Sequence, residues 1–178
     1  TAVSPVVVLA DTDIFKNAPK RLTASGVGDL LGKYTALADW KIAHTLTGEY
    51  ICDKICHMEY QALDALIASL DGLNKGSDEA YEMLMYGLLL SGLAMQMTGN
   101  SRPASGAEHH MSHLWEMEVY NDYIDFYHGK KVGVGLVLAA DIYHKAAAVM
   151  KKHEFTVRDQ VPIELEAIEK KIAENLRR

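Results

Sequence analysis

Helical periodicity is the strongest constraint on what this chain can fold into. From about Arg21 onward, apolar residues return at three- and four-residue spacing, as in Leu30, Leu31, Tyr34, Leu37, Ala38 and Ile42. A first helix is expected from near Gly28, and later helices over about 50–70, 77–97, 105–120, 131–152 and 162–176. The expected breaks are Gly72, Gly99 and Gly129. The pattern therefore predicts one antiparallel helical domain over residues 21–178.

Residues 5–10, with the sequence PVVVLA, form the one segment that predicts a strand. The run is short, rich in β-branched residues and bounded by Asp11, as is typical of a buried strand. A lone strand leaves its backbone N–H and C=O groups without a ladder unless another segment supplies one. We therefore expect its sheet to lie largely outside this chain.

The composition is that of a soluble globular domain. The chain has 178 residues, 49% of them hydrophobic and 24% charged, which is enough for one domain with a sizeable core. A net charge of -6 with scattered lysines and arginines argues against nucleic acid as a partner. No apolar run predicts a membrane span or a secretion signal. Cys52 and Cys56 lie four residues apart in a helical pattern and are expected to stay reduced, so the expected location is cytoplasmic.

The densest group of candidate ligands lies in residues 106–116, GAEHHMSHLWE. His109 and His113 are four residues apart and share a helix face, on which Glu116 also lies. His110 is turned by about 100° from His109. This favours His109 as a ligand, although a three-residue spacing to His113 keeps His110 as an alternative. Ser105 and Glu108 predict a capping box at the start of this helix.

Two further candidate ligands lie far from this segment in the sequence. Asp29 follows Gly28 at the expected start of the first long helix, where a carboxylate would also suit the helix dipole. His128 precedes a glycine that opens a later helix. A carboxylate and two imidazoles from three helices would make a three-ligand metal site with one position open. Such an ion can polarise a carbonyl or stabilise an alkoxide.

Three stretches of the sequence resemble a known family. They are residues 101–116 (SRPASGAEHHMSHLWE), 22–33 (LTASGVGDLLGK) and 128–133 (HGKKVG). Each closely resembles the sn-glycerol-1-phosphate dehydrogenases, a branch of the iron-containing alcohol dehydrogenase and dehydroquinate synthase superfamily. The resemblance covers essentially the whole chain and implies a mainly α fold, the helical domain of a dehydroquinate synthase-like enzyme. By that resemblance, residues 1–20 are the remnant of a mostly absent α/β cofactor domain, residues 21–178 are the metal-binding catalytic domain, and the chain is a fragment of a longer enzyme.

The same resemblance implies the chemistry of the site. Asp29, His109 and His128 would bind a divalent metal, with zinc expected and nickel or iron as alternatives. His113 would lie beside the substrate, and Asp29 would also face it. The implied reaction is reversible hydride transfer between NAD(P)H and dihydroxyacetone phosphate, with NAD(P) bound mainly by the missing N-terminal domain. The implied partner is a small phosphorylated polyol, with no nucleic acid or membrane partner, and a homo-oligomer is expected for the complete enzyme.

Several alternatives stay open from the residues alone. The substrate could be glycerol or another polyol, and the chain could be a non-catalytic helical interaction module. Glycines 26, 28 and 32 only approach a dinucleotide fingerprint, and they lack its strand–turn–helix context, so no cofactor-binding residue is predicted. A buried helical face explains Cys52, Cys56 and His57 better than a second metal site does. The candidates for binding a substrate phosphate are Lys33, Arg102, Lys130 and Lys131.

Overall fold

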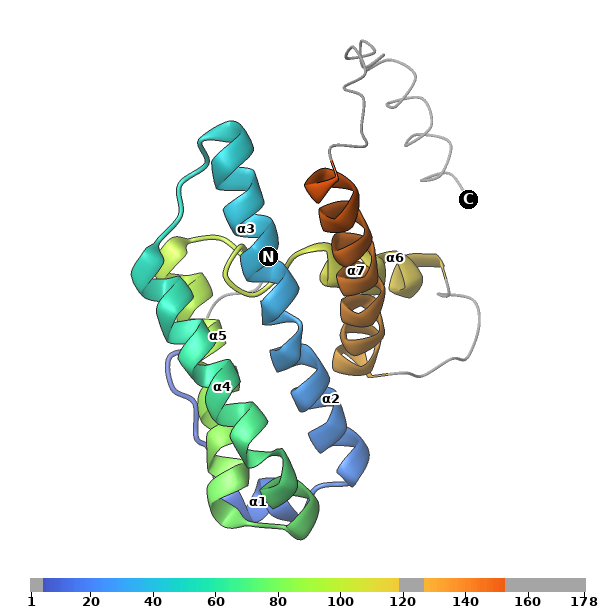
Figure 1. The fold of residues 1–178 in the computed structure, drawn as a ribbon. Coiled ribbons are helices and arrows are strands. Elements are labelled where there is room, and N and C mark those ends of the chain that lie inside the picture. Colours follow the sequence, from blue (N-terminus) through green and yellow to red (C-terminus); the bar gives the residue numbers. More distant parts are fainter. Residues whose placement is uncertain (1–4, 119–126, 153–178) are drawn as a thin grey trace. The chain divides into compact units, whose positions relative to one another are not determined.

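The fold is seen in a computed structural model that describes residues 5–118 and 127–152 (Figure 1). The helices are α1 (Thr12–Asn17), α2 (Lys20–Leu31), α3 (Lys33–Thr47), α4 (Asp53–Lys75), α5 (Asp78–Thr98), α6 (Ala107–Glu118) and α7 (His128–Lys151). The prediction of a mainly helical fold is confirmed. Two compact units divide at residue 144, and the described part of the second unit is the last turns of α7. The first unit contains every site described below.

Residues 5–10 differ from the prediction, because they form no strand. Val6 is 100% exposed and Leu9 is 91% exposed, so the apolar side chains of this segment do not pack. The physical reason is the absence of any second strand in residues 5–118 and 127–152, which leaves this segment no ladder to join. Asp11 instead begins α1, and its carboxylate accepts the backbone N–H of Asp13 at 3.0 Å.

The glycines do not all end helices where the sequence predicted. Gly28 lies inside α2, which begins eight residues earlier at Lys20 and ends beside Gly32. Gly72 lies inside α4, where it packs against α5 and a Cβ would approach the Ala80 Cβ to 2.9 Å. The chain turns instead at Gly76, with a φ of 78°. Gly99 ends α5 with a φ of 69°, as predicted. The helix predicted over 162–176 lies outside the described residues.

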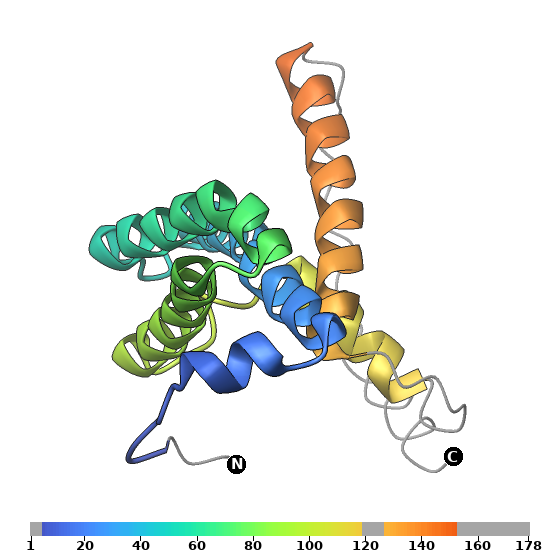
Figure 2. The ribbon, with the colours of Figure 1, turned by 90° about the horizontal axis from the view of Figure 1, so that it is seen from below.

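The core of the first unit forms where α4 and α5 pack against each other and against α2 and α3. Figures 1 and 2 show α4 and α5 lying side by side as a helical hairpin. Trp40, Leu63 and Leu66 are fully buried there. Full burial of a leucine side chain contributes about 1.5–3 kcal/mol relative to leaving it exposed. Helices α2 and α3 therefore pack against a well-buried α4–α5 hairpin.

Helix α7 also differs from the prediction. It is long and apolar enough to cross a membrane by length and composition, with a mean hydropathy of 1.4 over its most apolar window, whereas no such run was expected. Length and composition are weak grounds for a membrane span. One face of α7 packs on the domain, because Gly129 lies against α2 and Gly135 lies against α6. The charged and polar residues at its start belong to the site described next.

Candidate metal centre

Two of the three predicted ligands meet because α2 and α7 cross at a pair of glycines. A Cβ on Gly28 would lie 2.3 Å from the carbonyl oxygen of Gly129, and a Cβ on Gly129 would lie 1.9 Å from that of Ser25. Only glycine allows backbones to approach this closely. Asp29 follows the first glycine and His128 precedes the second, so the crossing brings both side chains together.

Asp29, His109 and His128 come from α2, α6 and α7 and form a compact donor set. His109 Nε2 lies 3.3 Å from Asp29 Oδ1, and His128 Nε2 lies 3.8 Å from the same oxygen. One ligand atom from each residue lies within 4.8 Å of the other two. A tetrahedral zinc with bonds of about 2.0–2.1 Å keeps its ligands roughly 3.3–3.5 Å apart. Small side-chain adjustments would therefore let these atoms share one ion.

Glu108 orients His109 from behind. Its side chain is fully buried, and its Oε1 lies 2.8 Å from His109 Nδ1. The same carboxylate accepts the backbone N–H of Gly106 at 2.7 Å and the hydroxyl of Thr35. Burial alone would raise the pKa of Glu108, but the bonds from His109, Thr35 and Gly106 outweigh it and lower the pKa. An ionised carboxylate only accepts, so Nδ1 carries the hydrogen and Nε2 is directed at Asp29.

His128 has the same arrangement on the other side. Its Nδ1 lies 3.0 Å from Glu116 Oε1, while its Nε2 faces Asp29. The bond from His128 is the largest cause that lowers the pKa of Glu116, to about 2, and Lys131 adds to it at 2.9 Å. Each histidine thus places Nε2 toward Asp29 and Nδ1 against a glutamate of α6. This pairing of carboxylate and imidazole is the usual support of a metal-binding histidine.

Asp29 is held ionised at the centre of the cluster. Burial alone would raise its pKa, but the bond from His109 and the ammonium of Lys33 outweigh it and hold the pKa near 2. Lys33 is almost fully buried, and its Nζ lies 3.1 Å from Asp29 Oδ2. For His109, burial lowers the pKa, but Asp29 and Glu108 together outweigh it and raise the pKa. A metal ion would occupy the place of the Nε2 proton that this arrangement favours.

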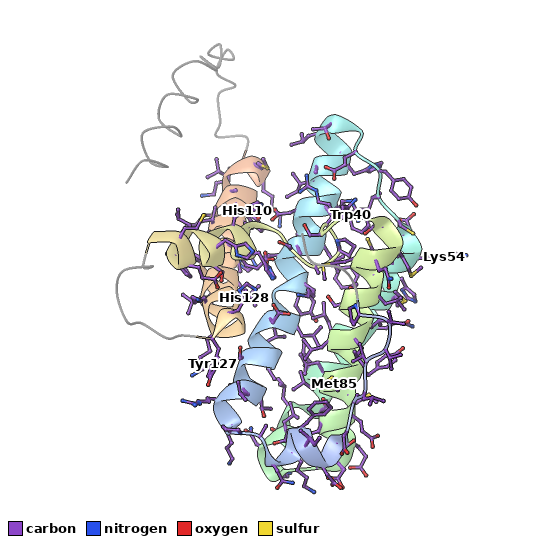
Figure 3. The ribbon with its side chains drawn as sticks, turned by 180° about the vertical axis from the view of Figure 1, so that it is seen from behind. Trp40, Lys54, Met85, His110, Tyr127 and His128 are labelled. Atoms are coloured by element: carbon purple, nitrogen blue, oxygen red, sulfur yellow. The ribbon has the colours of Figure 1, made fainter. Side chains whose placement is uncertain are left out.

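A second group of possible ligands shares His128 but suits an ion less well. It combines His128 with His113 and Glu116, and it is more exposed to solvent than the first group. His113 is therefore better placed beside the centre, with its ring stacked on that of His128 at 5.4 Å. His110 is exposed on α6 and belongs to neither group (Figure 3).

The start of α6 differs from the predicted capping box. Glu108 does reach back, but its carboxylate accepts from Gly106 rather than from Ser105. The helix begins two residues later than expected, at Ala107, whose N–H donates to Asp39 Oδ2 at 2.7 Å. Asp39 and Thr35 both come from α3, four residues apart on one face. Sequence reasoning missed both residues, because only the packing of α3 on α6 reveals their roles.

The candidate metal centre opens into a cavity of about 380 Å³. Helix α5 forms the facing wall with Leu88, Ser91, Gly92 and Met95, and Lys33, His113 and two serines, Ser101 and Ser105, also line it. Of the cations predicted to bind phosphate, Lys33 lines the cavity, whereas Arg102 is paired with Glu49 through two bonds of 2.7 Å. The cavity is large enough for a small polyol and is polar where it meets the metal centre.

The chain is similar to curated proteins named glycerol-1-phosphate dehydrogenase (NAD(P)+). It is 41% identical over 145 residues to one from Geobacillus thermodenitrificans, a match that covers 81% of this chain and 36% of the relative. It is 38% identical over 142 residues to one from Pyrococcus horikoshii, covering 80% and 40%, and 40% identical over 154 residues to one from Bacillus subtilis, covering 86% and 39%. The resemblance seen in the sequence is confirmed. No protein-family model matches the chain.

The coverage limits what this similarity says. The chain spans 36% to 40% of the length of these relatives. Their printed name includes NAD(P)+, and most of their length has no counterpart here. Within the chain itself, Asp29, His109 and His128 form a donor set of two imidazoles and a carboxylate that could hold a divalent ion and leave one position of a four-coordinate site open.

Proposed function

We propose that this chain is the metal-binding part of an oxidoreductase that reversibly reduces dihydroxyacetone phosphate to sn-glycerol 1-phosphate with NAD(P)H. The observation that carries the proposal is the convergence of Asp29, His109 and His128 beside a polar cavity. The name shared by the relatives supports the substrate and the cofactor. Residues 21–178 would be the catalytic domain, and residues 1–20 would belong to a cofactor domain that holds most of the NAD(P).

Each residue of the site has a proposed role. Asp29, His109 and His128 would hold a divalent ion, with zinc favoured over nickel or iron by the expected four-coordinate geometry. When bound, the ion supplies a Lewis acid for the oxygen of the substrate. Glu108 and Glu116 fix the two imidazoles, and Lys33 balances the charge of Asp29. His113, more than half exposed beside His128, would hydrogen-bond the substrate, which Asp29 would also face.

The complete enzyme would be a cytoplasmic homo-oligomer that acts on a small phosphorylated polyol. Kinetics on the complete enzyme would test the substrate by comparing dihydroxyacetone phosphate with unphosphorylated dihydroxyacetone. We expect the phosphorylated ketone to have the much larger kcat/KM. A preference for the unphosphorylated ketone would instead favour a glycerol dehydrogenase. An absence of turnover and of bound metal would favour a non-catalytic module.

A variant of His113 tests the roles within the site. In the complete enzyme, His113→Ala should retain its metal by elemental analysis but lose most of its activity. The reason is that the His113 side chain lies beside the three proposed ligands and is not one of them. Loss of the metal on this substitution would move His113 into the set of ligands. His57→Ala, on α4 and outside both ligand groups of the described residues, is the matched control and should keep both metal and activity.

A further inference from the structure

A second fully buried glutamate belongs to neither group of possible metal ligands among the described residues. Glu59, on α4, is 0% exposed, and within the described part of the chain neither of its carboxylate oxygens has a hydrogen-bond partner. Ser91, on α5, is 3% exposed, and its hydroxyl likewise has no partner among the described residues. Buried polar groups are seldom left unpaired, and the exceptions often have a function.

The surroundings of Glu59 favour its uncharged form. Leu63 and Leu66 follow it on α4 and are fully buried. Burial is the largest effect and raises the pKa of Glu59 to about 7, against the opposing effects of the Lys33 ammonium and the Ser91 hydroxyl. Lys33 is the charged neighbour from α3, and it also holds Asp29 of α2, while α5 contributes only the uncharged Ser91. Glu59 therefore exists as both acid and carboxylate near neutral pH.

Two residues connect Glu59 to the cavity. Ser91 and Lys33 both line the cavity, and both lie close enough to Glu59 to lower its pKa. A hydroxyl can accept a proton on one side while it donates its own on the other. Lys33 is bonded to Asp29, so Ser91 offers the more direct path. Ser91 thus lines the cavity and also neighbours a buried group that can hold a proton.

We propose that Glu59 is the proton-exchanging group of this site and that Ser91 carries the proton between Glu59 and the substrate. This role rests on the function proposed above. In the oxidation of the alcohol, the carbon-bound hydrogen leaves as hydride to the nicotinamide of NAD(P)+. The hydroxyl proton passes to Ser91 Oγ as Ser91 gives its own proton to Glu59, which becomes a carboxylic acid, and a ketone remains. Reduction returns the same proton to the carbonyl oxygen as the carbon receives the hydride.

The pH profiles of the complete enzyme test this role. In the parent, kcat for reduction should fall as pH rises through about 7, and kcat for oxidation should rise. Glu59→Gln should lower kcat about 100-fold and flatten both profiles, because an amide cannot exchange the proton. Metal content and KM should stay near those of the parent. Glu82→Gln, on the exposed face of α5, is the matched control and should keep the parental profiles.

Two substitutions at Ser91 decide the question if Glu59→Gln does not fold. Ser91→Ala should flatten the profiles as Glu59→Gln does, whereas Ser91→Thr keeps a hydroxyl and should keep the parental profiles. Parental profiles in either Glu59→Gln or Ser91→Ala would overturn the proton-exchanging role. A parent without dehydrogenase activity would overturn the proposed function and this role with it.

Infrared difference spectroscopy, which needs no turnover, distinguishes a failure of the proposed function from a failure of the role of Glu59. The complete protein should show the carbonyl stretch of a buried carboxylic acid at pH 6, weaker at pH 8 and missing in Glu59→Gln. Absence of this band in the parent would overturn the role of Glu59 whatever the substrate of the enzyme proves to be.

Discussion

Glu59 and Glu108 are both glutamates on helices, and both are fully buried, yet their surroundings favour different protonation states. Around Glu108, where α3 meets α6, three donors satisfy the carboxylate, and they lower its pKa against the effect of burial. Around Glu59, between α4 and α5, neither oxygen has a partner among the described residues, and burial raises the pKa to about 7. Hydrogen bonds, rather than burial, decide which buried carboxylate stays charged.

The two protonation states suit two different roles for a buried carboxylate. A carboxylate that is permanently charged and tightly bonded is suited to fix an imidazole in one orientation, as Glu108 fixes His109. A carboxylate that is easily protonated is suited to exchange protons. Glu108 contacts His109 and Glu59 neighbours Lys33, and both His109 and Lys33 line the cavity.

The largest expected effect comes from removing the partner of Glu108. His109→Ala should abolish metal binding in the complete enzyme, because it removes one of three ligands and leaves Glu108 without its imidazole. His110→Ala, on the exposed side of α6, should leave metal content near that of the parent. Elemental analysis after gentle purification measures both. If His110→Ala strips the metal while His109→Ala keeps it, the ligand is the neighbouring residue.

Truncation of Glu108 itself should be nearly as severe. Glu108→Ala leaves the buried Thr35 hydroxyl and the Gly106 N–H without their acceptor, so we expect the free energy of unfolding to fall by about 3–5 kcal/mol. Metal affinity should fall about 10- to 100-fold in Glu108→Gln, which keeps the size but not the charge. Urea denaturation and competition with a chelator measure the two effects. Parental metal affinity in Glu108→Gln would show that His109 needs no carboxylate behind it.

Glu59 should affect stability in the opposite way, with a dependence on pH. Its folded pKa of about 7 lies above the model-peptide value of 4.5, so the folded state binds more protons between these values. The contribution of Glu59 to the free energy of unfolding should therefore be fully present below about pH 4.5. It should be lost as pH rises through 7, which lowers the free energy of unfolding by roughly 3 kcal/mol. Glu59→Gln should remove this part of the slope in urea denaturation at a series of pH values. An unchanged slope would mean that Glu59 is not protonated in the fold.

The smallest expected effect is on the free energy of unfolding when one hydroxyl is removed beside each glutamate, Thr35 beside Glu108 and Ser91 near Glu59. Thr35→Val removes a donor to Glu108 and should cost about 1 kcal/mol. Ser91→Ala removes a hydroxyl that neighbours Glu59 without a hydrogen bond of normal geometry, so it should cost less than Thr35→Val, within about 0.5 kcal/mol of the parent. Thermal unfolding of the two variants side by side measures the difference. Equal losses would mean that Ser91 has a bonded partner in solution.

The sequence alone predicted the helical class from its periodicity, and the family resemblance predicted which residues form the candidate metal centre. Apolar spacing predicts helices well when they are long and amphipathic, as α4 is. The family resemblance named Asp29, His109 and His128 together, and their ligand atoms do converge. That they bind a metal stays a prediction.

What the sequence did not predict depends on contacts between distant segments. A strand pattern at residues 5–10 cannot report whether another strand lies beside it. Gly28 looked like a helix start because glycine is a poor helix former, but in the fold it serves the close approach of α2 to α7. The roles of Asp39 and Glu59 follow from which helix each side chain faces, and periodicity does not specify helix pairing.

The glycine crossing of α2 and α7 has a consequence for the kinetics of folding. Gly28 and Gly129 come from nearly opposite ends of the described chain, and Asp29 and His128 cannot meet until that long loop has closed. If the crossing forms after the main folding barrier, a divalent ion would find its three ligands assembled only on the native side. Bound metal would then slow unfolding, and so lengthen the lifetime of the folded state, while it left the refolding rate nearly unchanged.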